Sequence, residues 1–158
     1  MDELARRLGE RLKAASAVLA TAESCTGGWA AQVVTSVAGS SVWFDRGFVT
    51  YSDAAKQELL GVRAETLRSC GAVSEETARE MARGALERSQ ATVAVSITGI
   101  AGPGGGTPEK PVGTVCFAWA QRRGTKSDTR RLSGDRESIR RQSVVLALEG
   151  VLEALQGG

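Results

Sequence analysis

The sequence predicts a three-layer α/β/α fold in which helices cover both faces of a mixed β-sheet. Three observations lead to this prediction. Helical and strand-like patterns alternate along most of the 158 residues, which is the order expected of an α/β protein. A glycine-containing turn at residues 122–124 predicts a hairpin, which would add antiparallel strands to the sheet. The length fits one hydrophobic core, so we expect residues 1–158 to form a single domain.

The first half of the chain predicts two helices, a strand–turn–helix unit between them, and a further strand. Leucines four residues apart in a charged stretch predict an amphipathic helix over residues 2–15. Ser52 is a favourable N-cap, and Gly61 is a favourable stop for the helix between them. After the first helix, we expect a strand over residues 18–22, a helix over 29–37, a strand over 47–51 and the helix capped by Ser52 over 53–60.

The second half predicts two helices around three strands. Ser74 opens a helix whose apolar residues recur at helical spacing from Ala78 to Leu86. Small and β-branched residues predict a buried strand over residues 91–97. Asp135 is the expected N-cap of the last helix. After the buried strand, we expect a strand over residues 112–120, a hairpin turn at 122–124, a strand over 127–132 and the last helix over 135–155.

The N-terminal residues and the cysteines indicate the cellular compartment in which the protein works. Charged residues at positions 2–7 stand where a signal peptide would need an apolar region. No apolar run approaches the ~18 residues of a membrane span. Cys25, Cys70 and Cys116 are odd in number and widely spaced, which favours reduced thiols over disulfides or a metal site. We therefore expect a cytoplasmic protein with no membrane association.

A basic segment lies at residues 121–141, where eight Lys or Arg residues face three Asp or Glu residues. A solvated hairpin and helix face is the simpler interpretation. A site for an anionic ligand or for nucleic acid is the alternative.

The chain contains no histidine. This excludes a Ser-His-Asp triad, a Cys-His pair and every histidine-containing metal site. Any catalytic base must therefore be Asp, Glu, Lys or Tyr.

Ser24 is the first candidate for a nucleophile, because it lies where the strand turns into the helix beside Gly27 and Gly28. The backbone N–H groups of Cys25, Thr26 and Gly27 could hold an oxyanion at the helix start. Two alternatives stay open on the residues alone. Ser24 could be a plain helix cap, and Cys25 could be the nucleophile instead, since a helix N-terminus lowers the pKa of a thiol.

Lys56 is the candidate base. It lies near the start of the helix after Ser52, where the helix dipole disfavours positive charge and would lower the pKa of the amine. A neutral amine can activate serine. Tyr51, the one tyrosine of the chain, could relay a proton or position the attacked group. An exposed surface lysine and a tyrosine at the core edge are the alternatives.

The glycine-rich loop after residue 97 could bind an anion. Successive backbone N–H groups in such a loop form a nest that suits a phosphate. It lacks the Gly-Lys-Ser/Thr ending of a Walker A loop, and a flexible turn is the alternative. Thr98 adds a hydroxyl at the strand end. The glycines concerned are Gly102, Gly104, Gly105 and Gly106.

Five blocks in this order resemble one family. The blocks are TAESCTGG (21–28), GSSVWF (39–44), GFVTYS (47–52), TGIAGPGG (98–105) and SGDR (133–136). They are similar to the CinA C-terminal domain family, whose stand-alone members are nicotinamide-nucleotide amidases. The resemblance spans the chain and implies a three-layer fold, a homo-oligomer, and hydrolysis of nicotinamide mononucleotide to nicotinate mononucleotide and ammonia. It implies neither a metal nor another cofactor.

The resemblance also implies roles for residues. Ser24 would be the nucleophile and Lys56 the base, with Tyr51 and Thr98 in support. We expect the substrate phosphate on the nest from Gly102 to Gly106, with Arg136 or Arg140 of this or a neighbouring subunit. Longer family members carry an N-terminal domain similar to molybdopterin-binding proteins, which this sequence lacks, so we expect the dedicated amidase.

Two alternatives remain. The first is a non-catalytic module of DNA uptake or recombination, suggested by the competence-linked family name and the basic segment. The second is an amidase that acts on a different carboxamide. A candidate nucleophile, Ser24, and a candidate base, Lys56, are both present in the sequence. Their presence favours an enzyme over a module that binds nucleic acid.

Overall fold

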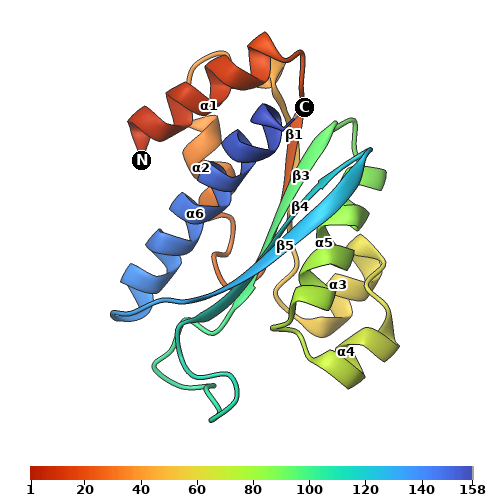
Figure 1. Cartoon of the computed structure of the whole chain (residues 1–158), viewed down its shortest axis with the longest axis vertical. Coiled ribbons are helices and arrows are strands. Elements are labelled where there is room, and N and C mark those ends of the chain that lie inside the picture. Colours follow the sequence, from red (N-terminus) through yellow and green to blue (C-terminus); the bar gives the residue numbers. More distant parts are fainter. Residues whose placement is uncertain (158) are drawn as a thin grey trace.

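The computed structural model describes residues 1–157, in which five strands form one sheet with helices on both faces (Figure 1). The strands are β1 (Leu19–Glu23), β2 (Phe44–Val49), β3 (Val93–Gly99), β4 (Thr114–Gln121) and β5 (Gly124–Arg131). The helices are α1 (Asp2–Ala14), α2 (Trp29–Thr35), α3 (Asp53–Leu60), α4 (Ala64–Cys70), α5 (Glu75–Glu87) and α6 (Arg136–Gln156), with a short 3-10 helix η1 (Ser40–Val42). The predicted three-layer fold is confirmed.

The sheet is mixed, as predicted. Its strand order is β2-β1-β3-β4-β5. β1 pairs in parallel with both β2 and β3, whereas β4 pairs antiparallel with β3 and with β5. The carboxyl ends of β1, β2 and β3 therefore meet at one edge of the sheet, which is where ligands bind in open α/β sheets.

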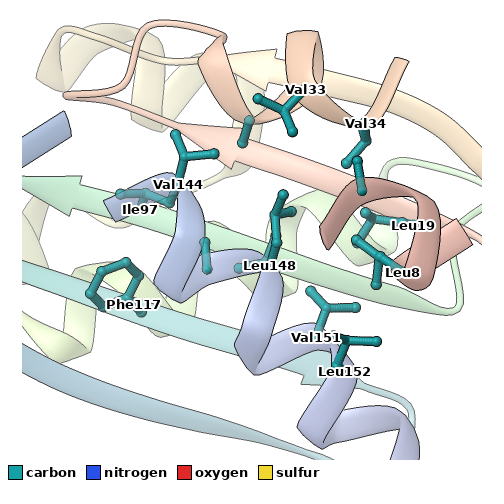
Figure 2. Close-up of a cluster of buried hydrophobic side chains, with 14 of the residues drawn as sticks. Leu8, Leu19, Val33, Val34, Ile97, Phe117, Val144, Leu148, Val151 and Leu152 are labelled. Atoms are coloured by element: carbon teal, nitrogen blue, oxygen red, sulfur yellow. The ribbon is translucent and has the colours of Figure 1, made fainter. Parts of the chain in front are cut away.

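Helices cover both faces of the sheet, as Figure 1 shows. On one face, Val144 and Leu148 of α6 lie over Ile97 of β3 and Phe117 of β4 (Figure 2). Helices α1 and α2 complete that layer, and α3, α4 and α5 form the other. Alanines of β1 and β3 meet Leu60 and the α5 helix there, so small side chains let this layer approach the sheet closely.

The predicted caps are confirmed. Ser52 Oγ accepts a hydrogen bond from the Ala55 N–H at 3.0 Å, and Gly61 ends α3 with φ of 69°. Ser74 and Asp135 cap α5 and α6 through their side chains in the same way. These caps satisfy N–H groups that have no partner within a helix.

Several elements differ from the prediction: η1 and α4 were not predicted, β2 lies nearer the N-terminus, and β5 begins at Gly124 and not at residue 127. β2 begins at Phe44 and ends at Val49, because the chain pairs with β1 directly after η1. α4 was not predicted, because its seven residues bury only Thr66 and give no apolar stripe. Glu80 of α5 fixes it instead, by accepting hydrogen bonds from the Arg63 N–H and the Thr66 hydroxyl.

Within residues 1–157, no helix is both long and apolar enough to cross a membrane.

Candidate active site

A pocket of about 280 Å³ opens at the carboxyl ends of β1, β2 and β3. Two backbone hydrogen bonds extend the pairing of the strands beyond their ends, toward the pocket. The Ser24 N–H donates to the Ile97 carbonyl at 2.9 Å, and the Thr50 N–H donates to the Glu23 carbonyl at 2.8 Å. The pocket is lined by Ser24, Cys25, Tyr51, Lys56, Ala72, Val73, Thr98, Gly99, Ile100, Ala101, Gly102, Gly104, Gly105 and Arg136. The three strand ends thus gather most of the predicted site residues.

Ser24 and Lys56 meet in this pocket. Lys56 Nζ lies 3.0 Å from Ser24 Oγ, which is direct hydrogen-bonding distance. The two side chains are 32 positions apart in the chain and come from different elements. Lys56 is only 1% exposed, so it is not a surface lysine. Ser24 is 8% exposed, and the N-cap of α2 is Gly28, so Ser24 is not the cap of that helix.

The Lys56 amine is held by main-chain carbonyls. Its Nζ donates to the carbonyl oxygens of Thr50 at 2.9 Å and Tyr51 at 3.2 Å. Burial lowers the pKa of Lys56, whereas the charges of Asp53 and Cys25 act to raise it. The pKa is therefore lowered, as predicted, but the main cause is loss of hydration and not the position of Lys56 in the helix.

The turn after Ser24 differs from the predicted oxyanion site. The Gly27 N–H donates to the Ser24 carbonyl at 3.1 Å, so this group is already paired and the prediction for Gly27 is wrong. The N–H groups of Cys25 and Thr26 make no hydrogen bond to another residue in the described part of the chain. Cys25 lines the pocket, whereas Thr26 is 0% exposed and does not line it. The Cys25 N–H therefore remains as the donor that could face an oxyanion.

Glu23 occupies the N-terminus of α2. Its carboxylate accepts hydrogen bonds from the Thr26 hydroxyl at 2.6 Å and from the N–H groups of Ala30 and Ala31 at 2.9 and 3.1 Å. A carboxylate satisfies the helix dipole and two unpaired donors together. The helix N-terminus is therefore not open to a substrate, and sequence analysis missed this role of Glu23.

Cys25 lines the pocket but its thiol is 7% exposed. Burial raises the pKa of Cys25 to about 12. At neutral pH the thiol stays protonated and is a poor nucleophile, which disfavours Cys25 as the rival to Ser24.

Tyr51 and Thr98 act through contacts that differ from those predicted. The Tyr51 side chain is 64% exposed at the pocket rim, and its contact with Lys56 is made by its backbone carbonyl. The Thr98 hydroxyl is buried and donates to the Ala72 carbonyl at 2.8 Å. Thr98 thus joins the end of β3 to the segment after α4.

The glycine-rich loop contributes one wall of the pocket. Gly102 and Gly105 have φ of 81° and 91°, which favours glycine. In residues 1–157, the N–H groups of Gly102, Gly104 and Gly105 have no hydrogen-bond partner. Arg136 Nη1 donates to the Gly102 carbonyl at 2.7 Å and lines the same pocket. These groups form a cradle of donors suited to an anion.

Two residues predicted for this cradle do not line the pocket. Gly106 packs against the backbone of Val112, where an added Cβ would lie 2.7 Å from the Val112 nitrogen. Arg140 donates through Nε to the Cys25 carbonyl at 3.0 Å and through Nη2 to the Thr26 carbonyl at 3.2 Å. The Arg140 guanidinium also lies 5.5 Å from the ring centre of Trp29, so it holds the turn and not the cradle.

The family model of the CinA C-terminal domain matches residues 1–155. The chain belongs to the CinA C-terminal domain family. A relative from Escherichia coli, named nicotinamide-nucleotide amidohydrolase PncC, is 58% identical over 149 residues, which are 93% of this chain and 90% of the relative. A relative of the same name from Pseudomonas putida is 51% identical over 150 residues, which are 95% and 94% of the two chains.

The fold of this CinA-family chain is also that of solved structures. The competence/damage inducible protein CihA from Agrobacterium tumefaciens matches it with a TM-score of 0.94 and 50% identity. The match covers 98% of this chain and 94% of that one.

In this CinA-family chain, several arginines of the basic segment are engaged within the molecule. Arg123 donates to the carbonyls of Ala154 and Gly157, and Arg130 pairs with Asp128. Arg136 and Arg140 also donate to main-chain carbonyls, as described above. In the described part of the chain, no cluster of three or more Cys, Asp or Glu residues is placed to hold a metal ion.

Proposed function

We propose that this protein hydrolyses the carboxamide of nicotinamide mononucleotide to nicotinate mononucleotide and ammonia, with Ser24 as nucleophile and Lys56 as base. The observation that supports this most directly is the buried contact of 3.0 Å between Lys56 Nζ and Ser24 Oγ. The names of the relatives from Escherichia coli and Pseudomonas putida supply the substrate.

The surroundings of Lys56 suit a neutral amine. A neutral amine has two N–H donors and one lone pair. The carbonyls of Thr50 and Tyr51 can accept both N–H groups, which leaves the lone pair for the Ser24 hydroxyl. Because burial lowers the pKa of Lys56, less free energy is needed to reach the neutral form in which the amine accepts a proton.

The chemistry then follows in two stages. Ser24 Oγ bonds to the carboxamide carbon while its proton moves to Lys56 Nζ, and the N–H group of Cys25 donates a hydrogen bond to the negative oxygen. The C–N bond breaks, and Lys56 returns the proton to the departing nitrogen, which leaves as ammonia. Water, deprotonated by Lys56, attacks the Ser24 ester and releases the acid, and Ser24 regains its proton.

We propose that the phosphate of the substrate binds the cradle of Gly102, Gly104, Gly105 and Arg136. The unpaired N–H groups of the glycines and the Arg136 guanidinium supply hydrogen-bond donors. The residues that line the pocket include no carboxylate that would repel a phosphate. Tyr51 at the rim would border the ring or the ribose, and Thr98 would act by fixing the pocket wall through Ala72.

Residues 1–158 are proposed to work as one catalytic domain, in a cytoplasmic homo-oligomer, and a Ser-Lys reaction of this kind calls for neither a metal nor another cofactor.

The test is ammonia release from nicotinamide mononucleotide in the presence of a chelator, with Ser24→Ala and Lys56→Ala beside the wild type. Release by the wild type alone is expected. No release by folded wild-type protein would refute the substrate, and other carboxamides and DNA would then be assayed. Release by Ser24→Ala at the wild-type rate would refute the nucleophile.

A further inference from the structure

One wall of the pocket is the short segment between α4 and α5. Ala72 and Val73 line the pocket there, between the C-terminus of α4 and the Ser74 cap of α5. The chain enters this wall through Gly71, whose φ of 81° favours glycine. The wall lies between the two helices. Gly71 before it is tied to α5, because its carbonyl accepts hydrogen bonds from the Ser74 hydroxyl at 2.9 Å and the Thr77 hydroxyl at 2.7 Å.

A second cavity lies on the other side of this wall. Val73 lines a second cavity of about 580 Å³, together with Cys70, Lys110 and Cys116. Val73 packs against the buried cluster of Ala78, Ala82, Cys116, Ala118 and Ala120, but the cavity leaves part of its surface without contacts. Polar contacts therefore contribute to the position of the wall.

Two hydrogen bonds tie this wall to the opposite side of the pocket. The first is that of Thr98 with the Ala72 carbonyl. The second is made by Lys110, whose Nζ donates to the Cys70 carbonyl at 2.7 Å. Cys70 is the last residue of α4, and a cation is favourable at such unpaired carbonyls of a helix C-terminus.

Lys110 belongs to the loop whose beginning forms the opposite wall. The loop joins β3 to β4 and lies at the same end of the sheet as α4 (Figure 1). Within it, the Thr107 N–H donates to the Lys110 carbonyl at 2.9 Å, and the Lys110 N–H donates to Thr107 Oγ1 at 3.0 Å. Lys110 is thus presented from a closed turn, and its side chain spans from one wall to the other.

We propose that Lys110 is a positioning residue that sets the width of the pocket by joining the glycine-rich loop to the C-terminus of α4. Lys110 does not line the pocket, so it acts through the wall and not on the substrate. Its loss should weaken substrate binding and leave the contact of Ser24 with Lys56 intact. The kinetic form of this inference rests on the proposed function.

The kinetic test compares KM and kcat for nicotinamide mononucleotide in the wild type, Lys110→Met and Lys110→Arg. Lys110→Met keeps the apolar stem and removes the donor. KM is expected to rise roughly fivefold, which corresponds to one lost hydrogen bond, with kcat changed less than about twofold. Lys110→Arg restores a donor and should restore KM. The matched control, Lys13→Met, changes an exposed lysine of α1 and should alter neither constant.

A second measurement does not depend on activity. Amide hydrogen exchange of a peptide spanning residues 70–74 should be faster in Lys110→Met than in the wild type, with exchange in α6 unchanged. Equal exchange and an unchanged KM would each overturn the inference. If exchange rises while the wild type releases no ammonia, the proposed function fails and the role of Lys110 in fixing the wall stands.

Discussion

Replacing Lys56 by methionine tests the core of the proposed mechanism. Methionine is similar in length and apolar, so it can fill the buried site while it removes the amine. Lys56 is 1% exposed and contacts Ser24 Oγ and the carbonyls of Thr50 and Tyr51. The substitution therefore removes the base and leaves the residues proposed to bind the substrate phosphate unchanged.

The size of the effect follows from these contacts. A positioned general base contributes about 10²–10⁴-fold, so the barrier should rise by about 3–5.5 kcal/mol. Two carbonyl oxygens lose a donor, at about 1–3 kcal/mol each, but a buried amine no longer needs to be desolvated. We expect the free energy of unfolding to fall by less than about 3 kcal/mol, which a domain of ordinary stability survives.

The assay is ammonia release from nicotinamide mononucleotide under saturating and subsaturating conditions, with thermal unfolding measured on the same samples. Lys13→Met is the matched control, because it makes the same change at an exposed site. A folded Lys56→Met protein whose kcat lies within about tenfold of the wild type would refute the role of Lys56 as base.

Three further predictions concern the surroundings of this pair. Arg136→Ala should raise KM for nicotinamide mononucleotide far more than it lowers kcat, because the guanidinium is proposed to bind the phosphate; an unchanged KM would sink that assignment. Because burial lowers the pKa of Lys56, kcat/KM should fall as the pH drops through a midpoint below the 10.5 of an ordinary lysine. The charge of Asp53 raises that pKa, so Asp53→Asn should move the midpoint to lower pH, by less than about one unit for an exposed charge. Glu58→Gln, on the same helix, should leave the midpoint unchanged. Equal midpoints for Asp53→Asn and the wild type would argue against Lys56 as the titrating group. Cys25→Ala should keep most of the activity, since burial raises the pKa of its thiol to about 12; a loss near the ~10⁶-fold that follows removal of a nucleophile would show that Ser24 is not the attacking group.

Local sequence signals were sufficient for most of the fold. Caps at Ser52, Ser74 and Asp135 and the stop at Gly61 act within one turn of a helix, so they can be read from neighbouring residues. α4 was missed because it buries only Thr66, and its support is Glu80, which lies 14 residues beyond Thr66 in the chain. No local pattern reports such a contact.

The candidate site was predicted in part for a similar reason. The absence of histidine excluded a histidine base, and the family resemblance carried by the five blocks implied Ser24 as nucleophile and Lys56 as base. The assignment for Gly27 was wrong, and Arg140 does not line the pocket of its own chain, because each prediction assumed a group open to the substrate. In the structure, the Gly27 N–H is paired with the Ser24 carbonyl, and the Arg140 guanidinium is paired with carbonyls of the same turn.

The sequence by itself determined the order of helices and strands, the absence of histidine chemistry and the family of the chain. These depend on composition, on short-range periodicity and on motifs that stand in order along the chain. The tertiary structure decided which atoms meet: the burial that lowers the pKa of Lys56, the carbonyls of Thr50 and Tyr51 around its amine, and the bond of Lys110 to Cys70, 40 residues earlier in the chain. Desolvation and hydrogen-bond geometry depend on distances between distant segments, and those distances exist only once the sheet has brought its strand ends together.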